Sequence, residues 1–456
     1  MSDASTGAMQ QFAEGGQPGG AGVPGLILLY AEQFAQLPAA WPLLAKVNTV
    51  GREAEQAVCL PVNAVSRTHA SLSWERGGFT LRDLESTNGT MLDGHPISEA
   101  RLEHGQELRF GDAIVKFVSR DADQFAHYRL DGSLSVGATR LAGKVQALVG
   151  GFQIDRIAQE IEKIAPADLS VMVLGESGTG KEVAARELHR LSGRRGSFCA
   201  VNCAAIPANL LESELFGFKK GAFSGADRDK PGLIKTAHQG TLLLDEIGDM
   251  PPEAQAKLLR VLQAREVFPL GATAPEPIDV RIICATHRDL THLREQGKFR
   301  DDLYARLNEY QLRLPPLRER KEDVYLLAQS FLKLHGRPGV RLSFAFMTGL
   351  LHYDWPHNVR ELESCIKRSL AVTESQTLEP QHLPPSVLDE MRDYGAPLKA
   401  TDSDTDHSAP DEATLRELLE RHQGNVAAVG RELGKARMQV HRWLKRYGIS
   451  LSEFRN

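Results

Sequence analysis

Three patterns of hydrophobic and polar residues follow one another along the chain. From residue 25 to 120, short alternating runs such as ASLSW at 70–74 are separated by Gly, Asn and Asp. Closely spaced short strands with turn residues between them predict an all-β sandwich. From residue 145 to 385, apolar runs of strand length alternate with longer helical patterns, which predicts an α/β domain with a largely parallel sheet. The last residues, 411–456, have the pattern of three short helices, an all-α domain.

Polar segments separate these three patterns. Residues 1–24 are rich in Gly, Ala, Gln and Ser, and we expect them to be disordered. Residues 121–144 are interpreted as a first linker, and residues 386–410, which are acidic and contain Pro, as a second. The chain has 456 residues. That length suits roughly three domains of about 150 residues, so a multidomain organisation is predicted.

Composition narrows the class of protein without naming a function. Charged residues make up 25% of the chain and hydrophobic residues 42%, as in ordinary soluble proteins. The net charge of -5 means that a nucleic-acid site would have to be local, and the five cysteines lack the spacing of a zinc site. The apolar run at 23–30 is far too short to span a membrane and has no basic segment before it. We therefore expect a cytoplasmic protein.

A nucleotide site is predicted where a buried strand ends in a glycine-rich loop. VMVL at 171–174 leads into GESGTGKE at 175–182, and a helical pattern follows. In this context the glycines let backbone N–H groups point at phosphates, and Lys181 reaches the β and γ oxygens. The Ser or Thr that usually follows the lysine and holds Mg²⁺ is replaced by Glu182. The predicted nucleotide-binding residues are Gly175, Glu176, Ser177, Gly178, Thr179, Gly180, Lys181 and Glu182.

A second strand supplies acidic residues for hydrolysis. GTLLLDE at 240–246 is an apolar strand that ends in two carboxylates. Asp245 can hold Mg²⁺ directly or through water, and Glu246 can orient and deprotonate the attacking water. The sequence therefore predicts that the chain binds ATP with Mg²⁺ and hydrolyses it.

Further polar residues stand near the ends of other segments. IICATHR at 282–288 places Thr286 and His287 at the polar end of a buried strand, near the expected γ-phosphate. Arg300 and Arg306 lie six residues apart, and Arg360 lies in the first turns of a helical pattern. Any one of these arginines alone would be read as a surface charge. Beside an ATP site, each is a candidate to neutralise transition-state charge.

These motifs together resemble the AAA+ domain of bacterial enhancer-binding proteins, the activators of sigma-54 RNA polymerase. The resemblance covers residues 145–385 and rests on GESGTGKE, TLLLDEIGDM, FRDDLYARL, LPPLRER, WPHNVRELE and the hexapeptide GAFSGA. It implies a P-loop ATPase with a small helical subdomain that works as an oligomeric ring, with a hexamer as the expected size. In that family the hexapeptide contacts sigma-54. The implied contact residues are Gly221, Ala222, Phe223, Ser224, Gly225 and Ala226, with Ser224 where the family usually has Thr.

The resemblance also implies roles for individual polar residues. Asn202 corresponds to a switch residue that holds Glu246, and Arg300 and Arg306 to arginine fingers given to the neighbouring subunit. Arg360 corresponds to the sensor II arginine. His287 stands where many members have Asn, and Glu182 is the family's own residue at its position.

The predicted β-sandwich carries three short polar motifs of its own, GR at 51–52, SRTH at 66–69 and STNGT at 86–90. These resemble a forkhead-associated domain, which binds phosphothreonine at its loop end. Arginines and a serine offer charge-assisted and neutral hydrogen bonds to a phosphate. The implied binding residues are Arg52, Ser66, Arg67, Thr87 and Asn88, while His69 braces the loops. The alternative is a sandwich that has lost binding and only packs on the ATPase.

The C-terminal segment is locally basic, with seven Lys/Arg against two Glu in residues 431–456. Small residues, a Gly in the turn and a basic third helix suggest a helix-turn-helix. The segment resembles the Fis-type domain of these activators, although Lys435-Ala436 stands where Ile-Ser is common. The alternative is a solvated basic helix. Candidate contacts to double-stranded DNA are Arg437, Gln439, His441, Arg442 and Lys445.

The resulting prediction is a three-part activator. The forkhead-associated domain binds a phosphothreonine protein, for which a Ser/Thr kinase is a candidate. The ATPase ring remodels sigma-54 RNA polymerase, and the C-terminal helices bind an upstream DNA site. One alternative is a DNA-binding regulator whose ATPase ring does not engage sigma-54. The near-intact GAFSGA argues against it. Another is an ATPase that remodels a different protein, which would not need basic C-terminal helices.

Overall fold

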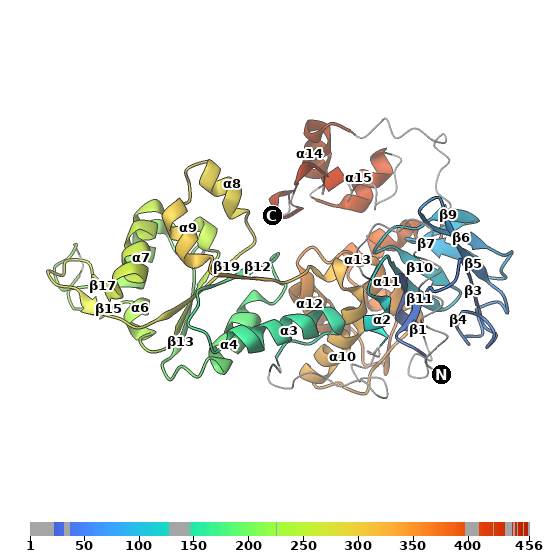
Figure 1. Ribbon diagram of the computed structural model, residues 1–456, viewed down its shortest axis with the longest axis horizontal. Helices are drawn as coiled ribbons and strands as arrows, with labels where there is room; N and C mark the ends of the chain where they lie inside the picture. The colour runs from blue at the N-terminus through green and yellow to red at the C-terminus, as the bar shows by residue number, and fades with distance from the viewer. Residues whose placement is uncertain are drawn as a thin grey trace. The chain divides into compact units, whose positions relative to one another are not determined.

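The computed structural model describes residues 22–31, 37–126, 145, 147–224, 226–396, 410–422, 424–433, 440, 443–444, 446–449 and 451–454 (Figure 1). Two compact units divide the chain. One comprises residues 1–138, 321–356 and 361–456, and the other comprises residues 139–320 and 357–360. No helix among the described residues is long and apolar enough to cross a membrane.

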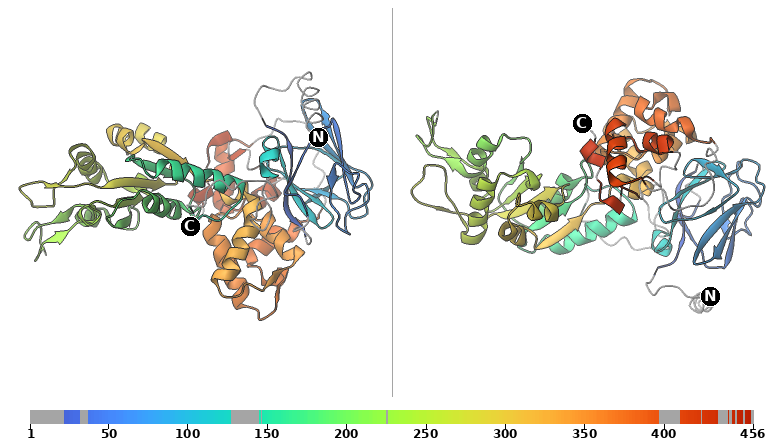
Figure 2. Two further views of the ribbon diagram at one scale, coloured as in Figure 1. Left: turned by 60° about the horizontal axis from the view of Figure 1, so that its bottom comes forward. Right: turned by 90° about the horizontal axis from the view of Figure 1, so that it is seen from above.

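The N-terminal part of the first unit is a β-sandwich of two sheets, as predicted (Figure 2). Strand burial alternates where one face meets the core, as in β5, whereas β1 and β11 are buried along their whole length. One sheet, in the order β2-β1-β11-β10-β7-β8, contains Ala40–Pro42, Gly25–Ala31, Ala113–Val118, Glu107–Phe110, Thr90–Leu92 and His95–Ile97. The other, in the order β4-β3-β5-β6-β9, contains Val58–Cys59, Val47–Gly51, Ala70–Glu75, Gly78–Asp83 and Glu99–Arg101.

The same unit contains a helical subdomain, residues 321–396 without 357–360. Its helices are α10 (Val324–Leu334), α11 (Phe344–His352), α13 (Pro385–Glu390) and the part of α12 (Asn358–Ala371) that follows residue 360. The short strands β21 (Arg341–Leu342) and β22 (Thr377–Leu378) pair in parallel beside them.

Short helices occupy the first residues of both predicted linkers. Residues 122–125 form helix α2 (Ala122–Phe125), whose two end residues are buried. Residues 385–390 form α13, which has a proline in its first turn and a buried Val387. Each helix is short and buries only two side chains, so the sequence shows too few apolar positions to reveal a helical pattern. Residues 127–144 and 397–409 lie outside the described residues.

The second unit is built on a five-stranded parallel sheet in the order β13-β16-β19-β12-β20, which confirms the predicted α/β domain. Successive residues of a strand face opposite sides. Met172 packs in one hydrophobic cluster with α5, α7 and α9, while Val171 and Val173 pack in another with α3 and α4. The strands are Phe198–Asn202, Thr241–Asp245, Arg281–Thr286, Val171–Leu174 and Tyr310–Arg313. The helices are Phe152–Ile164 (α3), Lys181–Leu191 (α4), Ala208–Phe216 (α5), Pro252–Ala264 (α7) and Asp301–Leu307 (α9).

The carboxyl ends of these parallel strands meet at one edge of the sheet. Strand β12 ends at Leu174, directly before the glycine-rich loop, and β13, β16 and β19 end at Asn202, Asp245 and Thr286. Ligands of open α/β sheets bind at this edge. The fold therefore gathers the polar residues singled out in the sequence.

The C-terminal residues contain α14 (Glu412–Arg421) and α15 (Val426–Leu433) around an apolar cluster that includes Leu415, Val429 and Trp443. Asp411 caps α14 by accepting from the backbone N–H of Thr414. The predicted third helix lies largely outside the described residues. So do all five candidate DNA contacts, Arg437, Gln439, His441, Arg442 and Lys445.

Candidate nucleotide and phosphopeptide sites

The glycine-rich loop has the geometry of a phosphate cradle. Gly178 and Gly180 have φ of +78° and +106°, in the left-handed region that favours glycine. A side chain at Gly178 would begin 2.1 Å from the carbonyl oxygen of His357. Helix α4 starts at Lys181, so its free N–H groups and its positive dipole end face the loop. Lys181 Nζ donates to the carbonyl oxygens of Gly175 (2.9 Å) and Glu176 (3.2 Å).

Glu246 is held at this loop by two basic side chains. Its Oε2 lies 2.7 Å from His287 Nδ1, and its Oε1 lies 3.5 Å from Lys181 Nζ. The backbone N–H of His287 donates to the same Oε2 at 3.3 Å. Glu246 itself has φ +50°, an uncommon conformation for a residue with a side chain, and such strain gathers at functional sites.

The two neighbouring carboxylates have opposite pKa shifts. Burial raises the pKa of Asp245, and the negative charge of Glu246 adds to this rise. Burial alone would raise the pKa of Glu246 too, but the hydrogen bond from His287 and the charge of Lys181 outweigh it and lower that pKa. Glu246 is thus ionised at neutral pH, as a base must be before it takes a proton.

Asn202 does not contact Glu246 as the resemblance implied. Its Nδ2 donates to Asp245 Oδ2 at 3.4 Å, and its Oδ1 accepts from the backbone N–H groups of Ala204 and Ala205. Asn202 and Asp245 are paired in register on adjacent parallel strands, so their side chains lie on the same face of the sheet. The Glu246 carboxylate instead contacts His287 and Lys181.

The three candidate arginines have different surroundings. Arg360 donates from Nη1 to Ser177 Oγ in the glycine-rich loop at 3.4 Å. Arg300 is paired with Asp302 at 2.7 Å, and Arg306 is exposed on α9. Both arginines are therefore on the surface of their unit. Thr286, at the end of β19, is buried, and its hydroxyl accepts from the backbone N–H of Arg288.

Residues without a predicted role brace the glycine-rich loop from outside. Arg318 donates to both oxygens of Glu176 at 2.5 and 2.7 Å, and Arg320 donates to the carbonyl oxygen of Thr179 at 3.1 Å. Asn358 donates to Glu176 Oε2 and to the carbonyl oxygen of Ser177. These residues lie within LPPLRER and WPHNVRELE, so the motifs marked them, but only the fold shows what they bind.

The described residues of the hexapeptide belong to a hydrogen-bonded turn. Lys219 and Gly221 donate backbone hydrogen bonds to the carbonyl oxygens of Leu270 and Ala226, and Gly221 has φ +83°. Phe223 is 45% exposed, and its ring meets the ring of Phe218 edge to face at 4.9 Å. Gly225 lies outside the described residues. The turn thus presents a supported aromatic ring to solvent.

The sandwich brings its three polar motifs to one end. The backbone N–H of Thr87 donates to Ser66 Oγ at 3.0 Å, and the backbone N–H of Arg52 donates to the carbonyl oxygen of Ser66 at 2.9 Å. The side chains of Arg52 and Arg67 are exposed there. Asn88 Nδ2 donates to the carbonyl oxygen of Ala64 at 2.7 Å. Five candidate phosphothreonine residues therefore share one surface.

His69 has the bracing position expected for it. It is fully buried, its Nδ1 lies 3.1 Å from the backbone nitrogen of Ser66, and its Nε2 lies 3.2 Å from the carbonyl oxygen of Gly89. Burial lowers its pKa, although the bond to Gly89 and the charge of Asp83 act the other way. The neutral ring holds two of the binding loops together.

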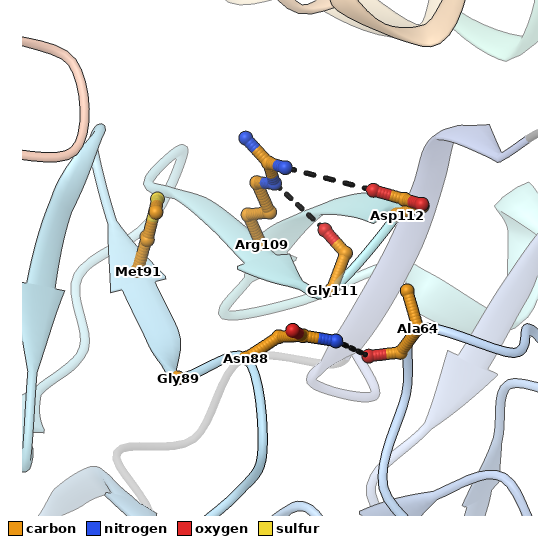
Figure 3. A pocket seen from close by; sticks show the side chains of 7 residues that line it. All are labelled: Ala64, Asn88, Gly89, Met91, Arg109, Gly111 and Asp112. Carbon is orange, nitrogen blue, oxygen red and sulfur yellow. Dashed lines mark hydrogen bonds and ion pairs between the residues drawn. The ribbon is translucent and has the colours of Figure 1, made fainter.

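A pocket of about 230 Å³ opens beside Asn88 (Figure 3). Arg109 lies at its wall, where its Nε donates to the carbonyl oxygen of Gly111 at 2.7 Å and its guanidinium is 3.6 Å from Asp112. The lining residues are Ala64, Asn88, Gly89, Met91, Arg109, Gly111 and Asp112.

Three known protein families match parts of this chain. Residues 150–313 match the sigma-54 interaction domain, residues 318–398 the AAA+ ATPase lid domain, and residues 48–111 the FHA domain. The lid match covers the helical subdomain through residue 396 and supports its extension beyond 385.

Several bacterial regulators are similar over most of the chain. UacR of Escherichia coli K12, by name a sigma-54-dependent transcriptional regulator, is 43% identical over 377 residues, which are 78% of this chain and 63% of UacR. The regulatory protein AtoC of the same organism is 42% identical over 64% of this chain and 66% of AtoC. The chain thus spans just under two thirds of the length of these two relatives.

Two further similarities cover more of the other protein. The transcriptional regulatory protein GlrR of Escherichia coli K12 is 38% identical over 75% of this chain and 78% of GlrR. The crystal structure of NtrX from Brucella abortus in complex with ADP has a TM-score of 0.50 and 32% identity, over 66% of this chain and 70% of NtrX. The FHA, sigma-54 interaction and lid domains follow one another along the chain, and its relatives include sigma-54-dependent regulators. The chain therefore belongs to the family of sigma-54-dependent transcriptional regulators.

Proposed function

We propose that this protein activates transcription by sigma-54 RNA polymerase, using ATP hydrolysis in an oligomeric ring. The observation that carries the proposal is the pairing, in one unit, of Lys181 and Glu246 at the glycine-rich loop with an exposed Phe223 on the hexapeptide turn. An aromatic ring that is almost half exposed is costly to leave in water, and aromatic residues are favoured at protein contacts. The turn lies between the two nucleotide motifs in the chain, where nucleotide state can move it.

Hydrolysis in this site would divide its work among the residues described. The loop N–H groups and Lys181 bind the phosphates, and Glu246 takes a proton from the attacking water. Asp245 fits a Mg²⁺ site because its half-buried carboxylate lies beside the negative Glu246, and bound Mg²⁺ would neutralise phosphate charge. Arg360 acts within the subunit, whereas Arg300 and Arg306 act on the neighbour's nucleotide. The ring, most simply a hexamer, follows from this division.

The other two domains would provide regulation, through phosphothreonine binding, and attachment to a DNA site. The exposed Arg52 and Arg67 and the hydroxyl of Ser66 support phosphothreonine recognition by the sandwich. The net charge of +5 in residues 431–456, from seven Lys/Arg and two Glu, supports double-stranded DNA as the ligand of a C-terminal helix-turn-helix of the Fis type. A protein with these partners acts in the cytoplasm.

The decisive experiment replaces Phe223 with Ala. We expect ATPase activity and DNA binding to be kept and sigma-54-dependent open-complex formation in vitro to fall at least about tenfold, since interface hot spots of this kind contribute about 2 kcal/mol or more. Phe268 is also 45% exposed and serves as the matched control for Phe→Ala. Retained open-complex formation by Phe223→Ala would favour the alternative, a DNA-binding regulator whose ring does not engage sigma-54.

A further inference from the structure

The β-sandwich and the helical subdomain meet through matched pairs of charges within the first unit. Lys116 of β11 pairs with Glu322, and Glu107 of β10 pairs with Lys321 at 2.9 Å. Glu107 and Lys116 face each other across the two strands, and Lys321 and Glu322 are neighbours in the chain. The side chains of Lys116 and Glu107 are only 4% and 2% exposed. Charges this deeply buried need their partners, so the contact is specific.

Aromatic residues make further contacts between the sandwich and the helical subdomain. The hydroxyl of Tyr30 donates to the carbonyl oxygen of Leu342 at 3.1 Å, and its ring lies 5.5 Å from the ring of Tyr325. On the sandwich side, the guanidinium of Arg109 lies 5.0 Å from the ring of Phe344 and 5.7 Å from that of Tyr394. At these distances a cation is attracted to an aromatic face.

The end of the helical subdomain follows the β7–β8 turn of the sandwich. The backbone N–H of Gly395 donates to the carbonyl oxygen of Gly94 at 2.7 Å, and His95 Nδ1 lies 3.1 Å from the carbonyl oxygen of Ala396. A side chain at Gly395 would begin 3.8 Å from the methyl carbon of Met91. Residues 394–396 therefore lie against a strand that also lines the pocket beside Asn88.

Two residues thus belong to both surfaces. Arg109 and Met91 line the pocket beside Asn88, and both also lie against residues 394–396 or Phe344 of the helical subdomain (Figure 3). A peptide held at Asn88 and Arg52 would place its residues next to the phosphothreonine in or beside this pocket. Those residues would compete with Phe344 and Tyr394 for the guanidinium of Arg109.

We propose that the helical subdomain and a phosphothreonine peptide are competing ligands of the sandwich, with Arg109 as the residue they share. The proposal rests on the proposed phosphothreonine recognition. Competition is reciprocal, so docking of the helical subdomain weakens peptide binding by the same factor by which the peptide weakens docking. The partner is a phosphothreonine protein, and its binding releases the helical subdomain.

Release of the helical subdomain from the sandwich would affect the glycine-rich loop through helix α12. Its first residue, Asn358, contacts Glu176 and Ser177 in the glycine-rich loop, and Arg360 in its first turn contacts Ser177. The same helix continues to Ala371 inside the helical subdomain. A sandwich bound to that subdomain restrains the helix that carries Arg360.

The test uses the full chain with a Glu322→Lys substitution. This change is outside the sandwich and places a third positive charge beside Lys116 and Lys321, so it disrupts docking without touching the peptide surface. The probe is the tightest-binding member of an oriented phosphothreonine peptide library, labelled with fluorescein and followed by anisotropy. We expect its affinity to rise about tenfold over wild type, in the range of ordinary coupling between sites. The double variant Lys116→Glu, Glu322→Lys restores opposite charges and returns the affinity toward wild type.

ATPase rate gives a second readout in the same samples. Saturating peptide should bring the wild-type rate to that of Glu322→Lys without peptide, in whichever direction the rate moves, and should leave the variant's rate unchanged. Thermal melting with the isosteric Glu322→Gln controls for loss of folding. Equal peptide affinity in wild type and Glu322→Lys overturns the competition alone. Failure of both to bind any phosphothreonine peptide overturns the recognition and the competition together.

Discussion

At the scale of single residues, His287 fixes the position of the Glu246 carboxylate and helps to keep its pKa low. Its ring and its backbone N–H both reach Glu246 Oε2, whereas Asn202 reaches Asp245. We infer that His287 positions the base rather than reacting with the water itself.

Replacing His287 tests this positioning role. His287→Ala should lower kcat for ATP hydrolysis by about 10²-fold, the cost of a catalytic group displaced by about 1 Å. His287→Asn, whose amide can donate to the same carboxylate, should keep most of the rate. KM for ATP should change little in both, because neither substitution alters the glycine-rich loop. Steady-state ATPase kinetics measure both constants, and an unchanged kcat in His287→Ala would refute the role.

The difference between Asn202 and His287 shows where sequence reasoning stops at this scale. The strand patterns placed Asp245, Glu246 and His287 at the polar ends of buried strands, and the resemblance added Asn202; in the structure the strands that carry Asn202 and Asp245 are adjacent and in register. Which pair forms a hydrogen bond depends on strand register and side-chain direction. A linear motif contains neither.

At the scale of elements, strand direction brings the candidate phosphothreonine loops of the sandwich to one end. The loops after β3, β4 and β6 meet because these three strands run in the same direction in one sheet. Strands β3 and β4 pair in parallel, and β5 runs antiparallel to both β3 and β6, with Val50 opposite Ala70 and Ala70 opposite Asp83. The turn between β5 and β6 then falls at the other end. That turn carries Arg76, which is exposed like Arg52 but far along the strand from the candidate site.

This arrangement provides a matched pair of arginine substitutions. Arg52→Ala should weaken phosphothreonine-peptide binding by about 10- to 100-fold, since charge-assisted hydrogen bonds contribute about 1.5–3 kcal/mol. Arg76→Ala removes the same charge from the opposite end and should leave the affinity within about twofold. Isothermal titration with phosphorylated and unphosphorylated peptides measures both. Unchanged affinity in Arg52→Ala would mean that the phosphate site is misassigned.

Element prediction succeeded where the pattern was long and regular. Apolar strands followed by helical patterns predicted the parallel sheet, and alternation with turn residues predicted the sandwich. Prediction failed at the linkers, where α2 and α13 each bury only a few side chains, such as Phe125 and Val387. Their helical state depends on contacts with distant segments, which no local pattern records.

The proposed ring places its hydrolytic groups on two different copies of the whole molecule. Glu246 would act in its own subunit, and Arg306, exposed on α9, on the neighbour. A site is then complete only when both contributors are intact. This division makes a mixing experiment informative.

Glu246→Gln and Arg306→Ala should each lose about 10²-fold or more of ATPase activity, the usual contribution of a general base or of an arginine finger. Mixed rings should regain activity, because an Arg306→Ala subunit keeps Glu246 and can receive Arg306 from a Glu246→Gln neighbour. The measurement is ATPase rate against mixing ratio at constant total protein. A rate that never exceeds those of the separate variants would show that Arg306 acts in its own subunit or not at all.

A single peptide bond, between Arg320 and Lys321, separates the residues that contact the glycine-rich loop from those that contact the sandwich. Arg318 and Arg320 grip the glycine-rich loop, and the next two residues, Lys321 and Glu322, pair with the sandwich. A chimera with another domain in place of the sandwich could keep every contact to the glycine-rich loop. Lys321 and Glu322 would nevertheless lose their partners Glu107 and Lys116 and would be left as unpaired charges. The modular appearance of the chain therefore hides a junction that has to be exchanged together with the domain it serves.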